Sequence, residues 1–116
     1  ERLQGVFLLF SCIPEDLMRA LESFATRAKE ALGDAEVYLF GSYARCDWIE
    51  DSDVDLVVVS DAFKNMDLGE RYALVRKMLP LNMGFEILTY TREEFEVAKR
   101  RSIVLRDASN YWIRIA

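Results

Sequence analysis

The sequence contains no histidine and only two cysteines among its 116 residues. The absence of histidine excludes acid–base catalysis by imidazole and metal sites with imidazole ligands. Cys12 and Cys46 lack the close spacing of a zinc site, so we expect reduced thiols in a cytoplasmic protein. No apolar run approaches the roughly 18 residues of a membrane-spanning helix, and we expect no membrane association. The apolar segment 5–10 is short and lacks the basic leader and cleavage site of a secretory signal.

Basic residues are also in the minority, since 15 Lys and Arg face 20 Asp and Glu, for a net charge of −5. This balance argues against an extended nucleic-acid surface, because phosphate backbones bind to a basic face. A single nucleotide is not excluded, since it needs only a few local cations and a metal. With 52% apolar and 30% charged residues, the composition is that of a globular protein. The length suits one domain over residues 1–116.

Hydrophobic patterning predicts helices and strands in alternation. Residues 5–10 fit either a strand or an apolar arm. The order α-β-α-β-α-β-α predicts an α/β (α+β) domain, with a small mixed β-sheet flanked by helices. Strands are expected at 36–40, 53–59 and 85–90, and helices at 14–32, 43–45, 67–79 and 91–101, with a last helix and a short strand in the tail. Within 67–79, one apolar stripe is expected from Leu68, Tyr72, Val75 and Leu79.

The most informative pattern joins a Gly-Ser turn to a pair of aspartates. Gly41 and Ser42 follow the first expected strand, at a turn suited to gripping phosphate. Asp53 and Asp55 open the next strand, where alternation places both side chains on one face with Cα atoms about 6–7 Å apart. Carboxylates so placed suit Mg²⁺, whose shell substrate phosphates often complete. The pattern therefore predicts metal-assisted phosphoryl or nucleotidyl transfer.

Each part of this pattern also has an ordinary structural interpretation. The serine alone is typical of a turn or a helix cap, and loop acids before a strand are often only solvated. Asp51, Asp53 and Asp55 match the first ligands of an EF-hand loop, but that loop needs glycine at its sixth position and glutamate at its twelfth. Leu56 and Ala62 stand there, so a calcium loop is excluded.

Two segments in combination resemble the signature of the DNA polymerase β-like nucleotidyltransferase superfamily. They are Gly41-Ser42-Tyr43-Ala44-Arg45 and Ser52-Asp53-Val54-Asp55-Leu56-Val57-Val58. The small size is similar to the minimal nucleotidyltransferase (MNT) branch, in which the catalytic domain stands almost alone. The similarity extends from the helix before the Gly-Ser strand to the third acidic strand. It implies the polymerase β-like nucleotidyltransferase fold.

The resemblance assigns Asp53 and Asp55 as catalytic ligands of two Mg²⁺ ions. Glu86 would occupy the position of the third catalytic and metal-binding carboxylate, where the family usually has aspartate. As an alternative, Glu86 is a strand-edge acid in solvent. Cys46 is a second departure, because the family often has glycine there, and a positive φ would strain a cysteine.

The same resemblance assigns the nucleotide-binding role to Gly41, Ser42 and Arg45. Gly41 would let the backbone approach the triphosphate closely, and Ser42 would donate a hydrogen bond to the β- or γ-phosphate. Arg45 would neutralise phosphate charge. As an alternative, Arg45 forms a surface ion pair with Asp47 or Glu50.

The implied activity is Mg²⁺-dependent transfer of AMP from ATP to a hydroxyl acceptor. Minimal nucleotidyltransferases of this kind resemble antitoxins paired with helical HEPN ribonuclease toxins, in which the acceptor is commonly a tyrosine of the toxin. The acceptor site would then come from a partner or from another copy of the chain, as a homo- or hetero-oligomer. Two alternatives remain open. One is a binding-only antitoxin or regulatory module with a vestigial nucleotide site, and the other is the catalytic domain of a drug- or RNA-modifying nucleotidyltransferase.

Overall fold

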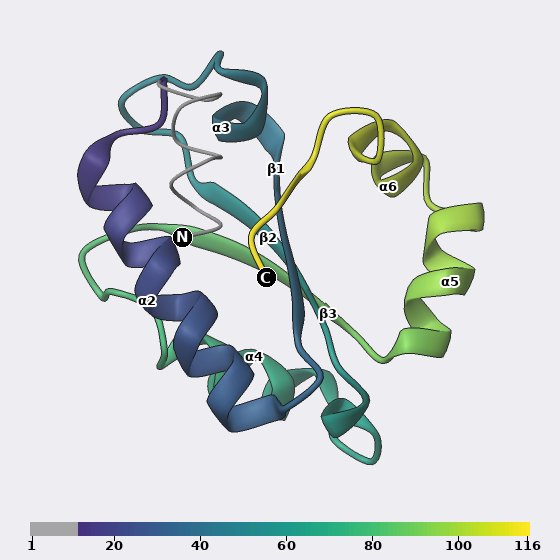
Figure 1. The fold of residues 1–116 in the computed structure, drawn as a ribbon. Coiled ribbons are helices and arrows are strands. Elements are labelled where there is room, and N and C mark those ends of the chain that lie inside the picture. Colours follow the sequence, from purple (N-terminus) through teal and green to yellow (C-terminus); the bar gives the residue numbers. More distant parts are fainter. Residues whose placement is uncertain (1–11) are drawn as a thin grey trace.

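One mixed sheet of four strands forms the centre of the molecule (Figure 1). Its strands are β1 (Glu36–Phe40), β2 (Val54–Val59), β3 (Phe85–Tyr90) and β4 (Ile113–Arg114), in the order β3-β2-β1-β4. β1 runs antiparallel to β2 and β4, whereas β2 and β3 are parallel. The computed structural model describes residues 12–116, so the strand or arm expected at residues 5–10 lies outside the described residues.

The helices are α2 (Glu15–Leu32), α3 (Gly41–Arg45), α4 (Leu68–Arg76), α5 (Arg92–Arg101) and α6 (Ile103–Ala108), with a 3₁₀ turn η1 (Asp61–Phe63) after β2. Gly33 ends α2 with a φ of 77°, and Thr91 and Glu94 form a capping box at the start of α5. These elements confirm the predicted mixed α+β fold. Within the described part of the chain, no helix has the length and apolarity needed to cross a membrane.

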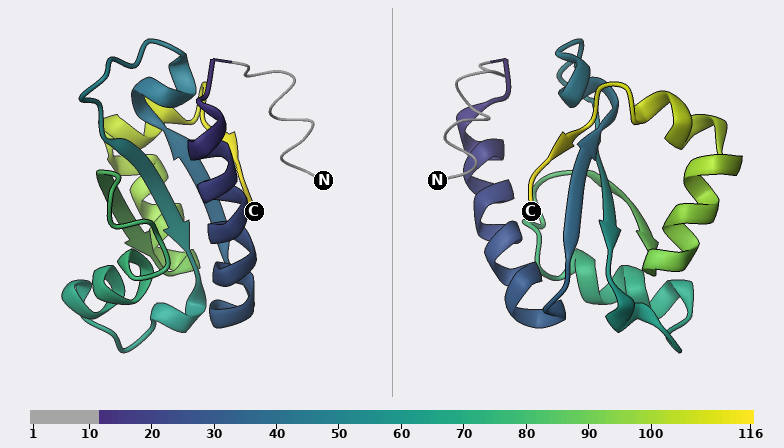
Figure 2. Two further views of the ribbon diagram at one scale, coloured as in Figure 1. Left: turned by 90° about the vertical axis from the view of Figure 1, so that its left-hand side faces the viewer. Right: turned by 45° about the vertical axis from the view of Figure 1, so that its right-hand side comes forward.

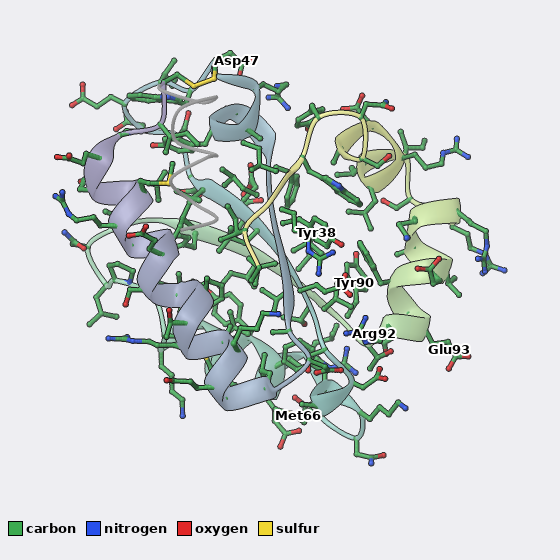
Figure 3. The ribbon with its side chains drawn as sticks, in the orientation of Figure 1. Tyr38, Asp47, Met66, Tyr90, Arg92 and Glu93 are labelled. Carbon is green, nitrogen blue, oxygen red and sulfur yellow. A yellow bond between two sulfur atoms is a disulfide. The ribbon has the colours of Figure 1, made fainter. Side chains whose placement is uncertain are left out.

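Helices cover both faces of the sheet (Figures 1 and 2). α2 and α4 pack on one face, against the buried side chains of Val37, Leu39 and Leu56. α5 and α6 pack on the other face, where the ring of Tyr38 lies 5.6 Å from that of Phe95. Figure 3 shows Tyr38 between the sheet and α5. Asp55 lies on the face covered by α5 and α6. Side chains alternate along β2, and the next residue, Leu56, points into the core on the opposite face.

The elements differ from the expected ranges at the site itself. α3 begins at Gly41 and not at residue 43, so the Gly-Ser pair forms the first turn of a short helix. β2 begins one residue after Asp53, which therefore lies in the loop that enters the strand. α4 ends at Arg76, three residues before the expected end at Leu79. Helix ends depend on tertiary packing, so patterning alone places them only approximately.

The expected apolar stripe of α4 is divided between core and solvent. Val75 and Leu79 are buried, but Leu68 is 71% exposed and Tyr72 is 44% exposed. Arg71 is buried in their place. Its Nη1 and Nη2 atoms donate to the Glu94 carboxylate over 2.6 and 3.2 Å, and its Nε donates to a backbone carbonyl over 3.0 Å. A guanidinium paired in this way can be buried.

The expectation of reduced thiols is wrong, because Cys12 and Cys46 form a disulfide with Cα atoms 5.8 Å apart. The bond joins the segment before α2 to the end of α3, near Asp47 in Figure 3. The same junction is fixed by the Trp48 indole N–H, which donates to the Cys12 carbonyl over 3.0 Å. Cys46 caps α3 with a φ of 65°, so the left-handed conformation expected of the family glycine is present.

Candidate active site

Strand register brings Asp55 and Glu86 together. Asp55 on β2 pairs with Glu86 on β3, which runs parallel to it, and with Phe40 at the end of β1. Paired residues on neighbouring strands point to the same face, about 4.8 Å apart between strand axes. Asp53 lies two residues before Asp55, and its neighbour Val54 donates its N–H to the Gly84 carbonyl over 2.9 Å. The carboxylates therefore gather at one end of the sheet.

Two glycines make room for these carboxylates. A Cβ on Gly41 would overlap the Asp55 carboxylate, and a Cβ on Gly84 would overlap that of Asp53. Gly41 also has a φ of 74°, a conformation that favours glycine. Gly84 was not among the predicted site residues, since its only signal in the sequence is its position next to β3. In the structure, the Asp53 carboxylate lies directly against Gly84.

Arg45 reaches the cleft from the last turn of α3. Its Nε donates to Asp47 Oδ2 over 3.1 Å, so the ion pair foreseen as an alternative is present. Its Nη1 also donates to the Tyr111 hydroxyl over 3.0 Å, and its guanidinium lies 5.3 Å from the centre of that ring. These contacts hold the cation at the cleft wall while 43% of the side chain remains exposed.

All of the predicted site residues line one cleft of about 640 Å³. On one side lie α3 and the sheet, which contribute Gly41, Ser42, Arg45, Asp53, Asp55 and Glu86. On the other side lie residues of α6 and the following loop, namely Ile103, Val104, Asp107 and Tyr111. The volume is that of a small-molecule site. Sequence reasoning missed the second wall entirely, because only the fold places α6 opposite the carboxylates.

Negative charge is concentrated in this cleft. Burial, together with the neighbouring charges of Glu86 and Asp53, raises the pKa of Asp55 to about 6, against a smaller opposing effect of Arg45. A bound cation would relieve this repulsion. Within residues 12–116, no three acidic or cysteine side chains already converge with metal-binding geometry. The all-oxygen donor set of Asp53, Asp55 and Glu86 nevertheless matches the ligands that Mg²⁺ prefers.

Comparison with solved structures finds two similar folds. A proposed nucleotidyltransferase from Sulfolobus solfataricus is 25% identical, with a TM-score of 0.55, over 69% of this chain and 74% of that one. Another proposed nucleotidyltransferase is 29% identical, with a TM-score of 0.51, over 69% of this chain and 87% of that one. No curated protein matches the chain significantly.

The match to a protein family covers most of the chain and both motifs. Residues 17–109 match the family described as the nucleotidyltransferase domain. This range includes the Gly-Ser turn, the aspartate pair and Glu86 on β3. The chain therefore belongs to the nucleotidyltransferase domain family.

Proposed function

We propose that this domain transfers AMP from ATP to a hydroxyl of a partner protein, with Mg²⁺ as cofactor. The observation that carries the proposal is the single cleft that contains both the Gly41–Arg45 helix and the carboxylates of Asp53, Asp55 and Glu86. A nucleotide triphosphate needs both halves, because its phosphates require N–H and cationic partners as well as metal ligands.

In this proposal, the residues of α3 bind the phosphates and the three carboxylates hold the metal. The α3 backbone at Gly41 and the Ser42 hydroxyl bind the leaving phosphates, and Arg45 neutralises part of their charge. Asp53, Asp55 and Glu86 would hold magnesium, which lowers the pKa of an attacking hydroxyl and stabilises the leaving pyrophosphate. The acceptor oxygen bonds to the α-phosphorus as the bond to pyrophosphate breaks. Glu86 accepts the proton that the hydroxyl loses.

We further propose that the acceptor is a tyrosine of an HEPN-type toxin, which this chain neutralises. The proposal is supported by the resemblance of the two motifs to the DNA polymerase β-like nucleotidyltransferase superfamily, whose minimal branch is similar to this chain in its small size. It is also supported by the net charge of −5, because an acidic surface complements a basic, RNA-cleaving partner. In this proposal the acceptor hydroxyl enters the cleft from another chain.

The test is a labelling assay with α-³²P-ATP, Mg²⁺ and the product of the adjacent reading frame. We expect label on that protein, lost on treatment with EDTA and in the Asp53→Asn variant. Asp51→Asn is the matched control, since Asp51 is an exposed acid of the same loop outside the cleft and should leave labelling unchanged. Absence of label with the wild-type chain under any metal would contradict transfer.

A binding-only antitoxin is the second candidate. It is favoured by the position of Arg45, which is paired with Asp47, and by the lack of a ready-formed metal site among residues 12–116. In that case Asp53→Asn would retain both partner binding and neutralisation. The enzymatic proposal requires neutralisation to fall together with labelling.

A further inference from the structure

The wall of the cleft opposite the carboxylates contains an exposed aliphatic pair beside Asp107 and Tyr111. Ile103 is 78% exposed and Val104 is 58% exposed, although both line the cleft. They open α6, and Ser102 caps that helix by accepting the Leu105 N–H over 3.2 Å. Leu105 and Ala108 of the same helix are fully buried and pack α6 against the core. The two aliphatic side chains are therefore presented to the cleft on a fixed support.

The distribution of charge in the cleft orients any nucleotide that enters it. Arg45 is the basic residue in the lining, and it lies on the α3 side with the Gly-Ser turn. The α6 side and the loop after it contribute Ile103, Val104, the carboxylate of Asp107, and Tyr111, whose hydroxyl accepts from Arg45. On the first side the Gly-Ser turn and Arg45 can donate to phosphates, and the three carboxylates would hold the magnesium that phosphates also bind, whereas the carboxylate of Asp107 on the second side repels them. The base and ribose of the nucleotide would then face Ile103 and Val104.

We propose that Ile103 and Val104 form the platform for the base of the bound nucleotide. This proposal rests on the nucleotidyl transfer proposed above, and it adds the half of the donor site that recognises the nucleoside. A flat base gains affinity by covering exposed aliphatic surface, which otherwise stays in water. The cleft of about 640 Å³ is continuous from the carboxylates to this platform and has the size of one small ligand.

The experiment compares two probes that share the phosphates but differ in the base. Affinities of Mg²⁺-ATP and Mg²⁺-tripolyphosphate are measured by calorimetry for the wild type and for the double variant Ile103→Ala, Val104→Ala. We expect ATP affinity to fall about tenfold and tripolyphosphate affinity to change less than twofold, from the loss of buried aliphatic area. Leu68→Ala on α4 is the matched control, because Leu68 is 71% exposed and lies outside this cleft.

A second measurement needs no variant. Methyl NMR of the wild type should show shifts at Ile103 and Val104 with Mg²⁺-ATP and none with Mg²⁺-tripolyphosphate. Equal affinity of the wild type for the two probes, with no methyl shifts, would overturn the platform while leaving triphosphate binding intact. Failure of both probes to bind would overturn the proposed function as well. Unchanged ATP affinity in the double variant with loss of acceptor labelling would assign this wall to the acceptor instead.

Discussion

At the scale of single residues, the charged form of Asp55 is destabilised by its surroundings, and a bound cation would offset this destabilisation. Its pKa is about 6 in the folded protein, against an ordinary value of 3.8, because it is partly buried beside two other acids. Between about pH 4 and 6, Asp55 therefore keeps its proton in the folded state but has lost it in the unfolded state. Stability falls as pH rises through this window. Residues arranged for function often carry such a cost.

Replacing Asp55 with asparagine should therefore stabilise the metal-free protein and abolish transfer. The amide keeps the shape but removes the repelled charge, and we expect a gain of about 1 kcal/mol at pH 7.5 after allowing for solvent screening. The measurement is urea unfolding in EDTA at pH 5 and pH 7.5. The variant should also show a smaller difference between the two pH values. A variant less stable than the wild type at pH 7.5 would show that the charge is compensated.

Gly84 provides a residue-scale test of how Asp53 is positioned. In Gly84→Ala the new methyl would overlap the Asp53 carboxylate, which must then move. We expect at least about a 100-fold loss of transfer activity, because a displacement of about 1 Å at a reacting centre has that effect. Activity is measured as label transferred from α-³²P-ATP.

Gly69→Ala is the matched control for Gly84→Ala. A Cβ on Gly69, in the first turn of α4, would make only an ordinary contact with Asp67, at 3.4 Å. This variant should retain activity and gain slightly in stability, since alanine favours a helix. If Gly84→Ala is as active as Gly69→Ala, then Asp53 does not depend on the space beside β3.

The residues of the site could be predicted to different degrees for identifiable reasons. Asp53, Asp55 and Glu86 could be found because alternation along a strand and the resemblance to a family both act on short segments. The positions of Gly84 beside Asp53 and of Ile103 in the cleft could not be predicted, because they arise only when β3 and α6 are placed beside the carboxylates. The hydrophobic pattern of one segment does not indicate which other segments pack beside it in the fold.

At the scale of elements, a disulfide links the end of the short helix α3 to the segment before α2. A helix of five residues has little stability of its own, and Cys46 ends it. The pairing of Cys12 with Cys46 spans 34 residues and could not be predicted, since no local pattern marks it. For the same reason the burial of Arg71 escaped prediction, because its partner Glu94 lies on another helix.

Reduction of the disulfide should destabilise the protein and loosen α3. Releasing a loop closed over 34 residues costs about 3–4 kcal/mol in the chain-entropy account. We expect the Tm to fall when dithiothreitol is added, as followed by differential scanning fluorimetry. The double variant Cys12→Ser, Cys46→Ser should unfold at the lower temperature with or without reductant. An unchanged Tm after thiol titration has shown full reduction would contradict this expectation.

At the scale of the whole molecule, an acidic chain with clustered carboxylates should be stabilised by the ions it binds. The net charge of −5 adds general repulsion to the local repulsion around Asp55. A ligand that binds only the folded state adds stability in proportion to the logarithm of its concentration over its Kd. Mg²⁺ with ATP should therefore raise the Tm more than Mg²⁺ alone, because the phosphates complete the metal shell.

This stabilisation should depend on pH in a direction set by Asp55. Magnesium bound as proposed would compete with the proton on that carboxyl, whose pKa is about 6, so we expect the metal to bind more tightly as pH rises through this value. The difference in Tm between samples with Mg²⁺-ATP and samples with EDTA should be small at pH 5 and larger at pH 7.5. Asp53→Asn should reduce the difference at both pH values, whereas Asp51→Asn should not. An equal difference at pH 5 and pH 7.5 would mean that the ligand binds without displacing this proton, and hence away from Asp55.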